Sequence, residues 1–464
     1  MCKKNGVKKN NTISLVGFVA IIFAIFAYDE GTPFPSVYTL LPVLGVVLII
    51  LYAQEETFAA KLLSTKLFVG AGLISYSAYL WHQPLFAFAR VRLIGEISVA
   101  LTLTLCVFTV VLAALSWKFI EQPFRRRRGI VTKTSIIFSS MFIMAFALST
   151  LGFVGHLSGG FPMRFDQNIR AMLSVSKDEN PYHRKCHLGD QRNTFAHPLE
   201  GCKDFFINGK ADVIFIGDSQ SDAISYKIQN LLKRKAVGSY AVSYGGCVGL
   251  PGLYLVDRDS AHKCAEYNQS MLRFAKEAGI KTLVITSRFP LYLDGTRFDN
   301  KEGGVERGRR TFVDLVQFRN KRLAFDSEIR RKRVKAYYRE ALENLLKEFN
   351  VVLVYPIPEA GWDVPSYLAK VSMLEVSGAK FSTSLRIYNS RNADVFDAFD
   401  GIASRRLFRV LPKNVFCSDE SERCFFSDSS KVFYKDSDHL SGYGAELIAP
   451  QIVEAINRSI VSLQ

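Results

Sequence analysis

The chain has 464 residues, 48% of them hydrophobic, and a formal net charge of +16 at pH 7. This length exceeds one ordinary soluble domain and predicts about two or three units. The charge does not indicate nucleic-acid binding, because the sequence contains no nucleic-acid-binding motif and no aromatic residues interleaved with the arginines. The basic clusters at residues 3–9 and 125–128 instead flank apolar runs, as cytoplasmic ends of membrane helices do.

Five apolar runs of roughly membrane-spanning length precede residue 156, at residues 14–28, 36–53, 67–89, 97–120 and 134–154. The first run lacks a small-residue cleavage site, so we expect no removable signal peptide. Five spans that start in the cytoplasm place everything after His156 outside. The sequence therefore predicts a multi-pass protein of the bacterial inner membrane with a periplasmic C-terminal part.

An even set of cysteines lies in the part that is predicted to be periplasmic: Cys186, Cys202, Cys247, Cys264, Cys417 and Cys424. An oxidising compartment favours disulfides, and we expect the local pairs Cys186 with Cys202, Cys247 with Cys264, and Cys417 with Cys424. Buried free thiols are the alternative. A zinc site is a weaker one, because no two of these cysteines form a C-x-x-C motif.

From residue 211 onward, short β-rich runs alternate with helical stretches. The predicted strands are residues 212–216, 240–243, 282–286 and 351–355, and the predicted helices are residues 221–235, 268–278 and 325–349. This alternation predicts a three-layer α/β domain with a mainly parallel sheet. In such a domain the functional residues lie at the carboxyl ends of the strands.

Gly217-Asp218-Ser219 follows the first of these strands directly and precedes a helix. A glycine permits the tight turn, and the N-terminus of the helix offers backbone N–H groups to a developing oxyanion. The turn therefore suits a nucleophile, although the same three residue types also form ordinary helix caps.

A second motif near the C-terminus favours the catalytic interpretation. Asp436 lies three residues before His439, so its carboxylate can fold back onto the imidazole. Asp436 would fix the tautomer of His439, which would then accept the proton of Ser219 as general base. Asp438 is the competing residue for the orienting role.

The GDS motif and the terminal D-x-x-H motif together resemble the SGNH hydrolases, over roughly the last 260 residues. The resemblance implies a Ser219–His439–Asp436 triad and an oxyanion hole made by the Ser219 N–H group and a glycine of the Ser243–Pro251 segment. We assign this glycine to Gly246, with Gly245 as the alternative. The asparagine that usually completes the hole is replaced by Thr286-Ser287-Arg288, which makes Arg288 a candidate donor. The alternative is that Arg288 is a salt-bridge partner or a surface residue.

The membrane half resembles the last helices of the membrane acyltransferase family 3, on the segments from Ser75 to Pro84 and from Trp117 to Arg125. Members that are fused to a periplasmic SGNH domain O-acylate surface polysaccharides. The early helices, which carry the essential arginine and histidine motif of that family, have no counterpart in this chain. We therefore expect this chain to resemble a C-terminal piece of such an enzyme. Either a separate chain supplies the early helices, or the gene is truncated, or the periplasmic domain works alone.

The sequence thus predicts four parts: a partial acyltransferase membrane domain with four spans (residues 1–130), an extra membrane helix (131–156), a connector (157–210) and an SGNH-like catalytic domain (211–464). The predicted function is O-acyl transfer, most simply of acetyl, to a polysaccharide such as O-antigen. The alternatives are a carbohydrate acetylesterase and a non-catalytic subunit of a split acyltransferase. The reaction requires no metal or resident cofactor, and acyl-CoA or another acyl donor would be a substrate.

Overall fold

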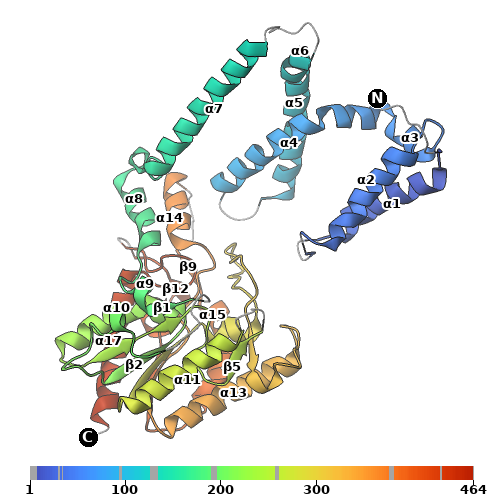
Figure 1. Ribbon diagram of the computed structural model, residues 1–464. Coiled ribbons are helices and arrows are strands. Elements are labelled where there is room, and N and C mark those ends of the chain that lie inside the picture. Colours follow the sequence, from blue (N-terminus) through green and yellow to red (C-terminus); the bar gives the residue numbers. More distant parts are fainter. Residues whose placement is uncertain are drawn as a thin grey trace. The chain divides into compact units, whose positions relative to one another are not determined.

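Figure 1 shows the chain as a computed structural model, which describes residues 8–29, 32–33, 35–93, 97–125, 134–189, 196–256, 261–375, 381–428 and 431–462. The chain divides into two compact units, Met1–Val154 and Gly155–Gln464. The division of the chain into four parts remains a prediction.

The first unit is helical, and each of the five predicted apolar runs forms a helix. These helices are α1 (Asn11–Ala27), α2 (Leu40–Tyr52), α4 (Lys66–Arg92), α5 (Val99–Ser116) and α7 (Thr134–Leu157), the last of which ends just beyond the unit. Large apolar side chains cover their outer surfaces; Phe26 is 84% exposed and Phe142 is 73% exposed. Such surfaces suit a lipid environment.

Two segments of these helices, Val99–Glu121 and Phe138–Leu157, are long and apolar enough to cross a membrane. Asn11–Ala27 and Val37–Tyr52 are apolar but shorter. The structure therefore supports membrane helices at two of the five predicted positions by length and composition. The five-span bundle remains a prediction.

A five-stranded parallel sheet forms the centre of the second unit. The strand order is β10 (Leu407–Val410), β8 (Asn350–Val354), β6 (Thr282–Thr286), β2 (Val213–Gly217) and β3 (Ser239–Ala241). Every residue of β2, β6 and β8 is buried. This burial agrees with their continuous apolar runs, because helices cover both faces of a parallel sheet.

Helices cover the sheet in two layers. On one face, α10 (Ser219–Arg234) packs against α17 (Gly442–Val461), while α11 (Ala261–Glu277) and α13 (Glu328–Leu346) cover the other face (Figure 1). The predicted α/β fold with a parallel sheet is confirmed. Three details differ from the prediction: α11 begins seven residues earlier than expected, the predicted strand 240–243 is divided between β3 and β4 (Ser243–Tyr244), and strand β10 was not predicted.

The segment before β2 belongs to this unit and adds a strand to it. It forms α8 (Gln167–Ser174), α9 (His183–Cys186) and β1 (His187–Leu188), and β1 pairs in parallel with β4, with His187 opposite Ser243. The three predicted disulfides, Cys186–Cys202, Cys247–Cys264 and Cys417–Cys424, are confirmed. The first of them closes the connector on itself immediately before β1.

Candidate active site

Ser219 lies at the turn between the central strand β2 and helix α10, at the carboxyl edge of the sheet. The turn needs Gly217, because a Cβ atom at that position would lie 1.9 Å from the backbone oxygen of Thr286 on the neighbouring strand. Ser219 is the first residue of α10. Its backbone N–H group therefore has no acceptor within the helix.

The side chain of Asp218 holds this turn in place through hydrogen bonds. Its carboxylate accepts hydrogen bonds from the backbone N–H groups of Gln220 and Arg288, both at 2.9 Å, and from the Tyr292 hydroxyl at 2.7 Å. Burial raises the pKa of Asp218, although these hydrogen bonds oppose the shift. Three donors around one buried carboxylate tie the end of β2 to the segment that follows β6, and thereby hold the Ser219 backbone in place.

The structure brings the three predicted catalytic residues together although 220 residues separate Ser219 from His439. The Nε2 atom of His439 lies 2.7 Å from the Oγ atom of Ser219, and its Nδ1 atom lies 2.7 Å from Oδ2 of Asp436. The other oxygen of Asp436 accepts from the backbone N–H groups of Asp438 (3.0 Å) and His439 (2.8 Å). An Nδ1–H donor toward Asp436 leaves Nε2 as the acceptor for the serine proton.

The surroundings of the imidazole favour its protonated form. Burial alone would lower the pKa of His439, but the negative charge of Asp438, together with the hydrogen bond and charge of Asp436, raises it to about 9. Burial would conversely raise the pKa of Asp436, yet its bond to His439 lowers it to about 2. An imidazolium that forms when Ser219 loses its proton is thus stabilised by two nearby carboxyl groups.

Asp438 does not occupy the orienting position, since its Oδ2 atom is 3.6 Å from Nδ1 of His439, farther than that of Asp436. Asp438 is instead 5% exposed and directed toward the guanidinium group of Arg288, with Oδ2 3.3 Å from Nη1. Burial raises the pKa of Asp438, and the charge of Arg288 opposes this shift.

The Arg288 side chain is surrounded by carboxylates. It donates from Nε to Glu359 at 2.6 Å, forms a bidentate pair with Glu306, and is paired with Asp438. These acids come from three different loops, and the charges of Asp438, Glu359 and Glu306 outweigh burial and raise the pKa of Arg288. The guanidinium is therefore held in an ion-pair network. This arrangement favours Arg288 as a salt-bridge partner over Arg288 as an oxyanion donor.

The two candidate glycines of the oxyanion hole differ in their hydrogen bonding. Gly245 donates its N–H group to the Leu188 backbone oxygen at 3.0 Å. Gly246 adopts a φ of 77°, in the region that favours glycine, and none of the described residues accepts from its N–H group. Gly246 thus remains the better candidate to complement the Ser219 N–H group.

Comparison with known proteins places this site in a family. Residues 176–454 match the family described as "SGNH domain (fused to AT3 domains)". The chain belongs to this SGNH family.

Among curated proteins, the SGNH chain is 25% identical over 234 residues to a provisionally named O-acetyltransferase of Staphylococcus aureus (strain COL), an alignment that covers 46% of this chain and 38% of the relative. It is 27% identical over 196 residues to a provisionally named peptidoglycan O-acetyltransferase of Bacillus subtilis, over 39% of this chain and 30% of the relative. The chain thus spans less than two fifths of the length of these relatives.

Among solved structures, the periplasmic domain of a lipopolysaccharide acetyltransferase from Salmonella ser. Paratyphi A is 13% identical, with a TM-score of 0.40, over 62% of this chain and 97% of that one.

Proposed function

We propose that this SGNH chain catalyses the transfer of an O-acyl group, most simply acetyl, to a cell-surface polysaccharide such as O-antigen, with Ser219 as nucleophile. The observation that carries the proposal is the continuous hydrogen-bonded row from Ser219 through His439 to Asp436. Family membership and the O-acetyltransferase names of relatives support the reaction class.

In the proposed mechanism, the Ser219 hydroxyl attacks the carbonyl carbon of an acyl ester while Nε2 of His439 takes its proton. The N–H groups of Ser219 and Gly246 stabilise the oxyanion. The tetrahedral intermediate collapses to an acyl-serine, and His439 returns the proton to the leaving oxygen. A sugar hydroxyl then attacks the acyl-serine and gives its proton to His439. The second tetrahedral intermediate collapses to the acyl ester of the sugar, and His439 returns the proton to Oγ of Ser219.

Water can replace the sugar hydroxyl in the second step, which would make the domain a carbohydrate acetylesterase. The side chains of His439 and Asp436 are 21% and 36% exposed, so the base lies within reach of solvent. We propose transfer rather than hydrolysis because the helical unit resembles the membrane acyltransferase helices that deliver acyl groups. We also propose that the SGNH unit lies in the periplasm and that acyl-CoA or another donor supplies the acyl group. A separate chain that carries the early helices of the membrane acyltransferase family is a proposed partner.

The experiment is turnover of a chromogenic acetyl ester by the full-length chain in detergent, with and without an oligosaccharide acceptor. Ser219→Ala and His439→Ala should each lower turnover by several orders of magnitude, because these residues act as one unit. Asp436→Asn should retain more activity than either, since the oxyanion hole and a partly competent base remain. Ser221→Ala, on the same helix, is the matched control and should stay within a fewfold of wild type.

Full turnover by a folded Ser219→Ala variant would end the serine-nucleophile proposal. A wild-type chain that binds saccharide but turns over no ester would favour the non-catalytic subunit. Acceptor-independent release of acetate alone would identify an esterase.

A further inference from the structure

A second group of polar side chains lies between the connector and α10, outside the triad. His183 of α9, His187 of β1 and Asp222 of α10 each offer one metal-ligating atom, and these atoms lie within 4.8 Å of one another. The Nδ1 atom of His183 is 2.6 Å from Oδ2 of Asp222. The two imidazole rings are stacked, with centroids 4.5 Å apart and an interplanar angle of 18°. The two histidines thus lie beside an aspartate that is at least 35 positions away from them along the chain.

The types of these residues indicate which ion would fit. Two imidazole nitrogens and one carboxylate oxygen are a common ligand set for Zn²⁺ and related divalent transition ions, whereas Mg²⁺ and Ca²⁺ prefer oxygen ligands alone. The two histidines are separated by three residues, a spacing that occurs in zinc-binding motifs.

The charge of Asp222 is a second, independent observation. Asp222 is 4% exposed, and among the residues that the structure describes no lysine or arginine forms an ion pair with it. Its ionisable partner there is His183, whose side chain is 32% exposed. A buried carboxylate without a fixed positive charge is costly, and a bound divalent cation would supply that charge.

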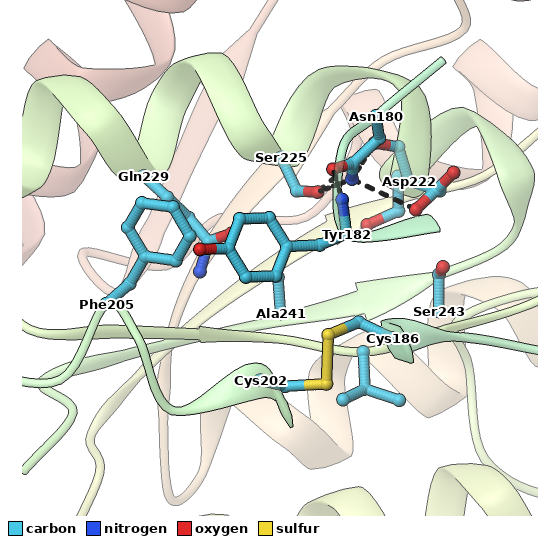
Figure 2. A pocket seen from close by; sticks show the side chains of 12 residues that line it. Asn180, Tyr182, Cys186, Cys202, Phe205, Asp222, Ser225, Gln229, Ala241 and Ser243 are labelled. Carbon is cyan, nitrogen blue, oxygen red and sulfur yellow. Dashed lines mark hydrogen bonds between the residues drawn. A yellow bond between two sulfur atoms is a disulfide. The ribbon is translucent and has the colours of Figure 1, made fainter. Parts of the chain in front are cut away.

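Other side chains hold two of the three ligands in position. The Nδ2 atom of Asn180 donates to Oδ1 of Asp222 at 3.0 Å and to Oγ of Ser225 at 3.2 Å (Figure 2). The other carboxylate oxygen of Asp222, Oδ2, contacts His183. The Oγ atom of Ser243 lies 2.7 Å from Nδ1 of His187. Hydrogen bonds of this kind fix the orientation of metal ligands, and their loss commonly weakens binding.

We propose that His183, His187 and Asp222 bind one divalent transition-metal ion of the zinc type. The ion fastens the connector to α10 one helical turn beyond Ser219, on the side of the helix that the connector covers. Three protein ligands leave room for water in the remaining coordination. The acyl-transfer mechanism proposed above does not use this ion, so the two proposals stand or fall separately.

The test uses the purified full-length chain in detergent, stripped with a chelator, reloaded with ZnCl₂ and desalted. We expect wild type to retain about one zinc per chain by elemental mass spectrometry. We also expect its unfolding temperature to rise with the concentration of ZnCl₂, because a ligand that binds the folded state stabilises it. His183→Gln and Asp222→Asn should each weaken apparent zinc binding at least tenfold.

His156→Gln is the matched control, since it removes an exposed histidine outside the cluster and should bind zinc as wild type does. Loading with Co²⁺ gives a second readout: the visible absorption of a low-coordinate cobalt site should appear in wild type and be lost in both ligand variants. The proposal is overturned if folded wild type retains no zinc. It is equally overturned if both folded ligand variants retain as much zinc as wild type, which would leave His183 and Asp222 as a simple hydrogen-bonded pair.

Discussion

Replacing Asp438 by asparagine removes a negative charge beside the proposed general base while it preserves the shape of the side chain. The Oδ2 atom of Asp438 lies 3.6 Å from Nδ1 of His439. At an effective dielectric constant of about 20, the attraction between two unit charges at that separation is about 4–5 kcal/mol, or about three pKa units. Arg288 lies 3.3 Å from the same carboxylate and cancels part of this effect. We therefore expect a decrease in the His439 pKa of roughly one to three units.

The sign of the effect follows from the role of the base. His439 must be neutral to accept the Ser219 proton, so kcat/KM for ester turnover should rise with pH through the His439 pKa, which is raised to about 9. In Asp438→Asn the imidazolium loses an anionic neighbour, and the rising limb of kcat/KM should move to lower pH. The plateau at high pH should stay within a fewfold of wild type, because Asp436 still orients the ring.

The assay is initial-rate turnover of a chromogenic acetyl ester from about pH 5.5 to 9.5, corrected for hydrolysis without enzyme. A limb that does not move, or that moves to higher pH, would refute the electrostatic reasoning. A loss of several orders of magnitude at every pH, beside an active Asp436→Asn variant, would transfer the orienting role to Asp438.

Three further predictions concern the ion-pair network, the cysteines and the membrane topology. Arg288→Met should lower the free energy of unfolding by about 3–5 kcal/mol, since it removes the cation that three buried carboxylates share and leaves Asp438 without an arginine partner; an unchanged denaturation midpoint would contradict this. Mass spectrometry of the non-reduced, alkylated chain should find no modified thiol among Cys186, Cys202, Cys247, Cys264, Cys417 and Cys424, and quantitative alkylation of any pair would eliminate that bridge. A reporter fused after Arg128 should behave as cytoplasmic and one fused after Phe165 as periplasmic; the same compartment for both would reject the five-span topology.

The parts of the fold that could be predicted from sequence are those with a strong local pattern. Strands β2 and β6 are continuous apolar runs, and the turn at Ser219 and the Asp436–His439 spacing are visible over a few residues. The local cysteine pairs were predictable for the same reason. Strand β10 was not predicted, because it is only four residues long and contains Arg409, which leaves too short an apolar run to recognise.

Features that depend on distant residues could not be predicted in the same way. The buried carboxylate of Asp218 accepts hydrogen bonds from the Arg288 backbone and the Tyr292 hydroxyl, about 70 residues away. Nothing in the local sequence indicates these contacts. The spacing of His183 and His187 was visible, but its third partner, Asp222, lies on another element and becomes apparent only when the connector packs against α10.

The network around Arg288 has a consequence for how this family can vary. Its three acids, Glu306, Glu359 and Asp438, are each at most 9% exposed in their side chains. Glu306 also pairs with Arg297 and Glu359 with Arg391, whereas among the described residues Asp438 pairs with no lysine or arginine other than Arg288. A substitution of the arginine alone leaves the buried Asp438 without a cationic partner, whereas a substitution of one acid alone leaves the guanidinium paired with the other two. We therefore expect the arginine to be lost only after Asp438 has become neutral, so that relatives without an arginine at this position should also lack this carboxylate. Relatives that keep an arginine at this position can lose one acid at a time. The combinations of residues found at these four positions among relatives should therefore show the order in which the substitutions occurred.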